Sequence, residues 1–502
     1  MTTSISNVSA QAPGRTTAAQ AATETTKPPP PPLVEIEQTW ASRLVFLTLT
    51  VAVVLSTLAF GTVDYFPLAI FQAGAALIVA LWALDAWRTR ALRLSSNSLQ
   101  WPLAGLILLG LIQLLPLGGM SQTGGALTGE VRQALSLDPY ATRLVLIQLV
   151  ALLIYFAAAL SFTDSPARLR TLVRTIIIFG FALAFFSIIQ SLISPTRIYG
   201  LREPRLAVPF GPFVNRHNFA AYMEMTLALP LGLLFSGAVE SEKRLLYLTA
   251  IGLMGVALLM SGSRGGLISL VAMVFFLVIL TGLKSQPRGL DGLAAEGLER
   301  TRHIVLRVGL AFALLIVLAA GAIMIGGESS MSRFVDTVNA SDPTTGRTNI
   351  WRVTLDVIKA NPLIGAGLGA YGVAYTPVDP RNGVNRPEQA HNDYLQVLAD
   401  AGIIGAILGL FFIAMLFRMA LRRRQSQDLF RRGVATGALA GCFALLVHSL
   451  FDFTLHTTAV ALLFLVMAAL ATVNGRVERA VVQRRSRLRS ADEFEDVYEL
   501  AE

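Results

Sequence analysis

Long apolar segments alternate with short polar ones along most of this chain. Each segment holds about 20 residues, the length that an α-helix needs to cross the ~30 Å hydrocarbon core of a bilayer. The pattern predicts an all-α polytopic membrane protein with about 12 transmembrane helices, near residues 44–63, 66–87, 101–118, 144–162, 174–193, 218–238, 245–261, 265–283, 305–325, 399–417, 433–452 and 458–475.

The composition supports this class and excludes a soluble multidomain enzyme. Of the 502 residues, 54% are hydrophobic and 15% are charged, whereas soluble domains have about 25% charged residues. The single cysteine, Cys442, allows no intramolecular disulfide. On a soluble protein the net charge of +9 would suggest nucleic acid as a partner, but here the charges must first be assigned to the two sides of a membrane.

The positive charges are distributed as in a protein with both termini in the cytoplasm. In that orientation, 28 of the 41 Lys and Arg residues lie in the predicted cytoplasmic pieces, as the positive-inside rule requires. The basic runs at 421–432 and 484–489 then contact membrane lipids, and we expect no nucleic-acid partner.

The polar segments divide the chain into five regions. Residues 1–42 form a Pro-rich cytoplasmic tail that we expect to be disordered. Residues 43–325 hold helices one to nine, 326–398 a loop domain on the outer side, 399–475 helices ten to twelve, and 476–502 a charged cytoplasmic tail. Long loops without structure are uncommon, so we expect the loop domain to be folded and functional. Within it, apolar residues at helical spacing predict an amphipathic helix over 346–360, which Asn361 and Pro362 end.

His391 is the first candidate for chemistry, because it lies at the predicted outer interface shortly before helix ten. A histidine there can take a proton from a hydroxyl near neutral pH, and Asn392 can orient a polar group. The alternative is an interfacial histidine that only bonds a carbonyl, and the residues alone leave both interpretations open. Gly402 and Gly405 follow at a spacing that lets another helix approach closely.

Several arginines near predicted helix ends are candidates for holding an anion. Arg347 opens the amphipathic helix, where a cation opposes the helix dipole unless an anion is bound there. Arg264 lies in the turn between helices seven and eight, and Arg216 and His217 end a basic outer loop over 194–217. For each arginine, the alternative is a solvated or snorkelling side chain.

Acidic side chains inside predicted spans are expensive and indicate either function or a structural partner. Glu224 lies within helix six, where Arg216 or Arg264 could be that partner. Asp452 and His448, near the outer end of helix eleven, are similar candidates.

Two further patterns carry little weight by themselves. His217, His391 and His456 have a spacing that fits no standard metal site, so we expect no metal. The glycine-rich stretch over 365–369 is interpreted as flexible backbone that can contact a ligand.

Taken together, these candidates place several arginines and a histidine at the outer face of the membrane. This set suits an anionic lipid head group whose sugar is transferred to a hydroxyl. The arginines would hold a diphosphate and stabilise its departing charge, and the histidine would deprotonate the acceptor.

The sequence resembles the O-antigen ligase and O-antigen polymerase-like superfamily over roughly residues 40–475. The ligase pattern of a histidine, a polar residue and two spaced glycines is met by His391, Asn392, Gly402 and Gly405. The stretches at 213–223 (FVNRHNFAAYM), 262–266 (GSRGG) and 361–371 (NPLIGAGLGAY) also resemble this family.

The resemblance implies a bacterial inner-membrane glycosyltransferase that acts on the periplasmic face without metal or other cofactor. It implies a glycan on undecaprenyl diphosphate as the donor, lipid A-core or another glycan as the acceptor, and inversion at the anomeric centre. The family's essential histidine maps to His391 and its loop arginine to Arg347, while Arg264 and Arg216 join Arg347 in binding the diphosphate. Five residues are expected to support this site: Asn392, Glu224, His217, Trp351 and Asp452.

Other functions stay open at this point. The ligase form of the loop motif often has Leu where this chain has Trp351, which leaves a polysaccharide polymerase open. A solute transporter of the bicarbonate type is a further alternative, although the two halves of the chain show no clear repeat. The last is a non-catalytic member of a polysaccharide assembly, and other assembly proteins are candidate partners.

Overall fold

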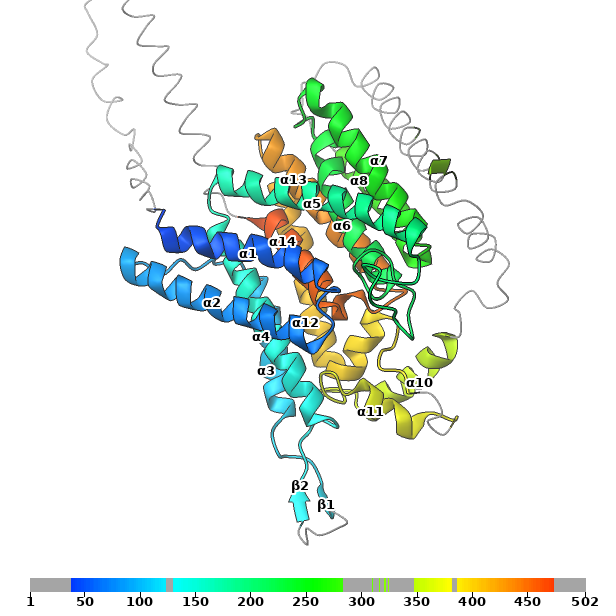
Figure 1. The fold of residues 1–502 in the computed structure, drawn as a ribbon. Helices are drawn as coiled ribbons and strands as arrows, with labels where there is room; N and C mark the ends of the chain where they lie inside the picture. Colours follow the sequence, from blue (N-terminus) through cyan, green and yellow to red (C-terminus); the bar gives the residue numbers. More distant parts are fainter. Residues whose placement is uncertain are drawn as a thin grey trace, which may run out of the picture. The chain divides into compact units, whose positions relative to one another are not determined.

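The structure is a computed structural model that describes residues 38–122, 130–282, 347–381 and 386–473, with five further positions between 309 and 324. Within these ranges the chain is helical apart from one antiparallel two-stranded ribbon (Figure 1). The long elements are α1 (Trp40–Leu58), α2 (Tyr65–Thr89), α3 (Gln100–Gln113), α4 (Pro139–Phe162), α5 (Pro166–Ile193), α6 (Arg216–Phe235), α7 (Arg244–Met260), α8 (Arg264–Gly282), α10 (Arg347–Ala360), α12 (Asp393–Arg423), α13 (Leu429–His448) and α14 (Thr458–Thr472). The short ones are β1 (Met120–Gln122), β2 (Glu130–Arg132), η1 (Ser241–Lys243), α11 (Tyr371–Tyr375), η2 (Thr376–Val378) and η3 (Thr454–His456).

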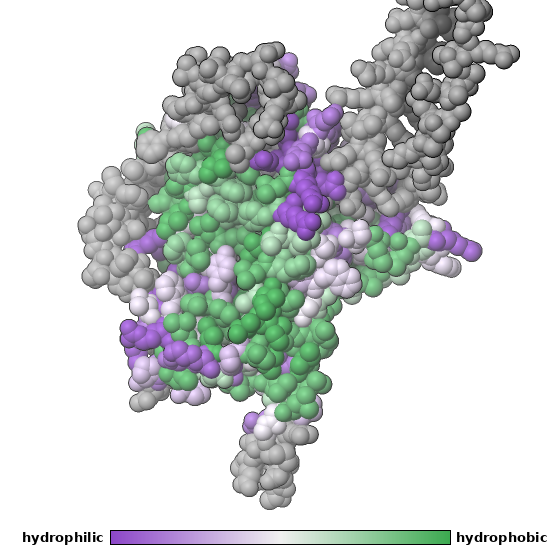
Figure 2. Space-filling model, turned by 180° about the vertical axis from the view of Figure 1, so that it is seen from behind, coloured by the Kyte–Doolittle hydropathy of each residue, from purple (hydrophilic) through white to green (hydrophobic). Residues whose placement is uncertain are grey.

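The protein is a multi-pass membrane protein. Among the described residues, nine helices are long and apolar enough to cross a membrane, and α3 and α14 are shorter apolar helices. Many large apolar side chains on these helices are exposed, and Figure 2 shows how they cover much of one face. The span predicted at 305–325 lies almost entirely outside the described residues, so the count of twelve stays a prediction, as do the two tails.

Contacts at the two ends of α8 show which helix ends lie together. Arg424, just after α12, donates to the carbonyl of Leu280 near the end of α8. At the opposite end, Ser263 before α8 contacts His448 at the end of α13. His217 at the start of α6 also contacts Ser263, and the amide of Asp393 at the start of α12 donates to the carbonyl of Ser449 just after α13. The starts of α6, α8 and α12 therefore lie at the same end of the bundle as the end of α13.

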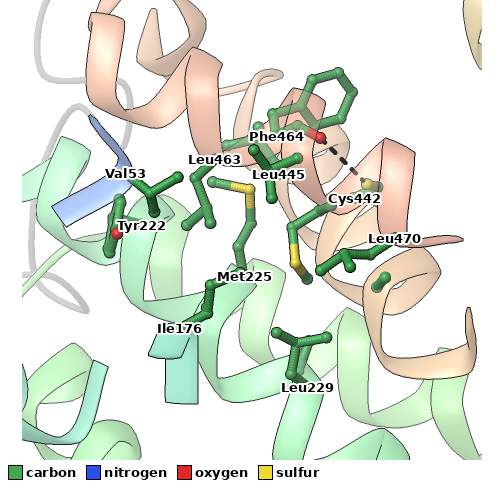
Figure 3. Packing of buried hydrophobic residues seen from close by; sticks show 14 of the residues in the cluster. Val53, Ile176, Tyr222, Met225, Leu229, Cys442, Leu445, Leu463, Phe464 and Leu470 are labelled. Carbon is green, nitrogen blue, oxygen red and sulfur yellow. Dashed lines mark hydrogen bonds between the residues drawn. The ribbon is translucent and has the colours of Figure 1, made fainter. Parts of the chain in front are cut away.

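Of the nine membrane-length helices in the described ranges, α6 and α13 are the most buried, and their backbones come into close contact. A Cβ added to Gly232 of α6 would lie 2.4 Å from the backbone of Gly437 on α13. Small residues at such positions let two membrane helices approach closely. α14 packs beside them, and Figure 3 shows Met225, Cys442 and Leu463 from the three helices in the shared core.

The amphipathic helix predicted at 346–360 is confirmed as α10, which ends before Asn361. Its apolar side chains Val353 and Val357 are buried, and the helix packs on α12 (Figure 1). This contact places Arg347, the first residue of α10, beside the start of α12.

α12 begins earlier than the predicted residue 399, and it is broken in the middle. Its backbone at Gly402 (φ 61°, ψ −160°) is not helical, and the amides of Ile403 and Ile404 donate to the carbonyls of Pro362 and Leu363. The interpretation of Gly402 as a contact for another helix is therefore wrong, since its close neighbour is the loop at 362–365.

The glycine-rich stretch over 365–369 is closely packed, which corrects its interpretation as flexible backbone. Gly365, Gly367 and Gly369 have φ values of +75°, +119° and +78°, a region that favours glycine. A Cβ on Gly365 would lie 2.3 Å from the backbone of Asp400, and one on Gly367 would lie 2.1 Å from Ser136 Oγ. The stretch thus fits against α12 and supports its first turns.

Candidate active site

Asp452 lies at the centre of a polar cluster at the end of the bundle where α6, α8 and α12 begin. Its side chain is only 2% exposed. Asp452 Oδ1 lies 3.2 Å from His391 Nδ1, and Oδ2 lies 3.2 Å from Arg347 Nη2 and 3.7 Å from His217 Nδ1. Three of the residues singled out in the sequence are therefore gathered around the carboxylate of a fourth, Asp452.

Arg347 is held by two acceptors from the segment after α13. Its Nη1 donates to the carbonyl of Phe451, and its Nη2 pairs with Asp452. The side chain is 19% exposed, so it is partly accessible from the surface. The cation at the start of α10 is thus anchored in the cluster and is not simply solvated.

His391 has an unusual backbone, with φ at 53°. Such a conformation in a residue other than glycine costs of order 1–3 kcal/mol and persists where the surroundings fix it. Both chain neighbours of His391 are held by hydrogen bonds. Trp351 Nε1 donates to the carbonyl of Ala390 at 3.0 Å, and Asn392 Nδ2 donates to the carbonyl of Leu450 at 3.0 Å.

Asn392 also explains why α12 begins where it does. Its side-chain oxygen accepts hydrogen bonds from the amides of Tyr394 and Leu395 at 3.0 and 3.1 Å, which is the geometry of an N-cap. His391 consequently lies directly before a capped helix, with its side chain 31% exposed.

The contact with Asp452 determines how His391 can act. A carboxylate only accepts, so Nδ1 of His391 must carry the proton and Nε2 remains as an acceptor. Burial alone would raise the pKa of Asp452, but the hydrogen bond from His391 and the charge of Arg347 outweigh it and hold that pKa below its ordinary value. An ionised Asp452 can stabilise a positive charge on His391.

A second Asp–His pair also joins the start of α12 to the segment after α13. Here α12 supplies the aspartate and the segment after α13 supplies the histidine. His456 Nδ1 lies 3.1 Å from Asp393 Oδ1, and the side chains are 32% and 5% exposed. The other carboxylate oxygen accepts from Ser449 Oγ at 2.8 Å and from the amide of Leu455 at 3.3 Å. Burial alone would lower the pKa of His456, but the hydrogen bond and the charge of Asp393 raise it.

Glu224 and His448 form a pair within the bundle. Glu224 Oε1 lies 2.8 Å from His448 Nδ1, and neither side chain is exposed. From the sequence, Arg216 or Arg264 is the expected partner of Glu224, and His448 is grouped with Asp452. Nothing in the spacing of the two residues along the chain indicates that they meet.

Ser263 links this pair to the cluster and is not among the site residues predicted from the sequence. Its Oγ lies 3.4 Å from His448 Nε2 and 2.9 Å from His217 Nδ1. Its only sequence signal is that it directly precedes Arg264.

Arg264 and Arg216 are the first residues of α8 and α6, and each is partly exposed. Each is the chain neighbour of a cluster residue, Ser263 and His217 respectively. In the basic loop before α6, Arg202 pairs with Asp64, and Arg197 pairs with Glu203 at 3.3 Å, so part of the positive charge of that loop is neutralised. No group of three or more His, Cys, Asp or Glu within the described ranges is placed to hold a metal.

Comparison with known proteins gives a match to a family model. No curated protein sequence matches the chain. Residues 249–410 match the family model described as O-antigen ligase. This range includes Arg264, Arg347 and His391, whereas Glu224, His448 and Asp452 lie outside it. The resemblance drawn from the sequence is confirmed over this range, in which the chain is similar to the O-antigen ligase family.

Proposed function

We propose that the protein transfers a glycan from an undecaprenyl-diphosphate-linked donor to an acceptor hydroxyl. It acts in a bacterial inner membrane, on the periplasmic face, with both termini in the cytoplasm. The observation that carries this proposal is the contact of His391 and Arg347 with the one buried carboxylate of Asp452. It supplies a base and a cation at one end of a set of membrane helices, within reach of a lipid head group.

His391 is the base in this reaction. Nε2 takes the proton of the acceptor hydroxyl, and the acceptor oxygen forms a bond to the anomeric carbon of the donor sugar. The bond from that carbon to the diphosphate breaks, and the electron pair leaves with the diphosphate. A single displacement of this kind inverts the anomeric centre and needs no metal. General base catalysis contributes about 10²- to 10⁴-fold to such a rate.

The arginines hold the donor and stabilise the leaving diphosphate. Arg347 has a fixed position in the cluster, and Arg264 and Arg216 begin the two neighbouring helices. Fixed cations aimed at a developing negative charge are among the largest contributions to catalysis. His217, Glu224, Trp351 and Asn392 keep these groups in place.

The acceptor is lipid A-core in a ligase and another lipid-linked glycan in a polymerase. Both acceptors present a hydroxyl, so the same base serves either reaction. The loop domain at 326–398 is the part of the chain proposed to recognise them, and other polysaccharide assembly proteins are partners of this face.

The proposal is tested with the purified full-length protein in detergent, a chelator, and an undecaprenyl-diphosphate-linked oligosaccharide. A ladder of longer glycans from this donor alone indicates a polymerase. A single transfer that requires added lipid A-core indicates a ligase. If the folded protein forms no product with either acceptor, the proposal is wrong.

A further inference from the structure

A buried acid and a buried histidine lie among the apolar helices of this protein, and the transfer chemistry does not use them directly. Glu224 and His448 have no exposed side-chain surface. Polar groups of this kind are costly inside a membrane span and usually mark a functional element. The close contact of α6 with α13 fixes both residues, because each helix carries one of them.

The ring of His448 is also held by the start of α8. A Cβ added to Gly265 would lie 2.9 Å from His448 Nε2 and 2.8 Å from Cδ2. The absence of a side chain at Gly265 thus leaves room for the ring to face Ser263. Ser263 Oγ in turn accepts a hydrogen bond from the amide of Gly266 at 3.1 Å, which fixes the hydroxyl at the start of α8.

A continuous series of contacts leads from this pair to the cluster. It runs from Glu224 to His448 (2.8 Å), from His448 to Ser263 (3.4 Å) and from Ser263 to His217 (2.9 Å). His217 Nδ1 then faces Asp452 Oδ2 at 3.7 Å, which is too long for a hydrogen bond.

We propose that Glu224 and His448 are positioning residues for the transfer site, and that they act by fixing the proton of Ser263 toward His217. The inference rests on the proposed function for its kinetic consequence. Its structural part, the protonation pattern, is independent of that function.

The hydrogen-bond inventory fixes the pattern once His448 is doubly protonated. Ser263 has one proton to donate, and His448 and His217 both lie within reach of it. When His448 is doubly protonated beside an ionised Glu224, its Nε2 donates to Ser263. Ser263 then donates to His217 Nδ1, so His217 carries its own proton on Nε2 and offers none to Asp452. The carboxylate of Asp452 then accepts hydrogen bonds from Arg347 and from Nδ1–H of His391, without competition from His217.

Loss of the Ser263 hydroxyl should reverse this arrangement. His217 Nδ1 then takes the proton and turns a partial positive charge toward Asp452 Oδ2, 3.7 Å away, which weakens the electrostatic stabilisation of a protonated His391. The charged and titratable groups that face His391 and His217 are Asp452, Arg347, Arg216 and His448. Asp393 lies two residues after His391, and Arg264 directly follows Ser263. Only the donor on His217 changes, so the acid limb of the pH–rate profile should move to lower pH.

The test compares three variants at the junction. Ser263→Ala removes the hydroxyl, and Ser263→Thr keeps the hydroxyl that accepts from the amide of Gly266. Gly265→Ala removes no polar group but displaces the ring of His448. Gly252→Ala is the matched control, because a Cβ there meets nothing within 4 Å.

The first measurement is nitrogen-15 NMR of the full chain labelled only at its five histidines. We expect an unprotonated Nδ1 on His217 in the wild type, in Ser263→Thr and in Gly252→Ala, and a protonated one in Ser263→Ala and Gly265→Ala. The second is glycan transfer, for which Ser263→Ala and Gly265→Ala should lower kcat about tenfold, the effect of losing one hydrogen bond to a charged group, with an unchanged KM for the donor.

The outcomes separate the two proposals. If the state of His217 is the same in all proteins, or if the pH–rate profile does not move while kcat falls, the positioning role is wrong. If His217 responds as expected but the wild type transfers no glycan, the arrangement is correct and the proposed function is wrong.

Discussion

Two Asp–His pairs connect the start of α12 with the segment after α13, and they differ in what surrounds the carboxylate. In both, Nδ1 of a histidine contacts Oδ1 of an aspartate, at 3.2 Å for His391 with Asp452 and 3.1 Å for His456 with Asp393. In both, the histidine is about one third exposed and the carboxylate is buried.

The second carboxylate oxygen distinguishes the pairs. In Asp393 it accepts from Ser449 Oγ and the amide of Leu455, both within the protein scaffold. In Asp452 it faces Arg347, and the partner histidine has a positive φ. We infer that the Asp393 pair ties the segment after α13 to the start of α12, while the Asp452 pair is arranged for a ligand. The predictions below test this distinction.

The largest effect is expected for Arg347→Ala. Loss of the guanidinium removes a cation from the diphosphate, so transfer should fall by about a thousandfold. Arg347→Lys should retain part of the activity, because it keeps the charge but not both contacts. Initial rates per amount of folded protein give the result. Lys359→Ala is the control on the same helix, with a side chain that is 76% exposed, and a similar loss there would contradict the assignment.

Replacing the two aspartates by asparagine should separate their roles. Asp452→Asn removes the charge that stabilises a protonated His391, so kcat should fall about a hundredfold. Asp393→Asn should lower the unfolding temperature and leave kcat within about threefold, since only a scaffold hydrogen bond to a charged group weakens. Kinetics and thermal unfolding of both variants provide the measurement. Equal losses of kcat would show that the pairs do not differ in function.

The stabilisation that each pair contributes to the fold should also depend on pH differently. The pKa of His456 is raised by folding, so its stabilisation is complete below the unfolded value of about 6.5 and is lost as the pH rises through the folded value. The pKa of Asp452 is lowered, so its stabilisation is present above about 3.9 and is lost only as the pH falls below that.

Thermal unfolding in detergent between pH 5 and pH 9 checks this prediction. The destabilisation caused by His456→Gln should shrink as the pH rises, whereas that caused by Asp452→Asn should stay constant. A constant difference for His456→Gln would mean that its pairing with Asp393 contributes no charge-dependent stability.

The smallest effect is expected for Trp351→Phe. This change removes the hydrogen bond from Nε1 to the carbonyl of Ala390, which precedes His391, and keeps the aromatic ring. One such bond contributes about 1 kcal/mol, so kcat should fall about fivefold with little change in unfolding temperature. A rate equal to that of the wild type would show that this bond does not hold His391 in place.

Much of this fold could be predicted from the sequence, because membrane helices are recognised by length and apolarity. The start of α12 could not be predicted in this way. Its first turns carry Asp393, Gln396 and Asp400, which are buried against the glycine-rich stretch and neighbouring loops. A polar segment that packs inside the protein has no distinct hydropathy signal.

The site was only partly predictable for a related reason. His391 and Arg347 were recognised by their position in a family pattern, and Asp452 by its charge near a helix end. The contacts of His448 with Glu224 and Ser263 join residues 224 and 185 positions apart. Such contacts depend on how α6, α8 and α13 pack, and neither periodicity nor spacing contains that information.

The central claim is that transfer requires the Asp452–His391 pair and not its counterpart. The most direct test compares His391→Ala with His456→Ala in the purified-protein transfer assay, with rates normalised to folded protein. We expect no measurable transfer by His391→Ala, and a rate within about threefold of the wild type for His456→Ala, the limit set by one scaffold interaction. Transfer by His391→Ala at a rate near that of the wild type would contradict the account.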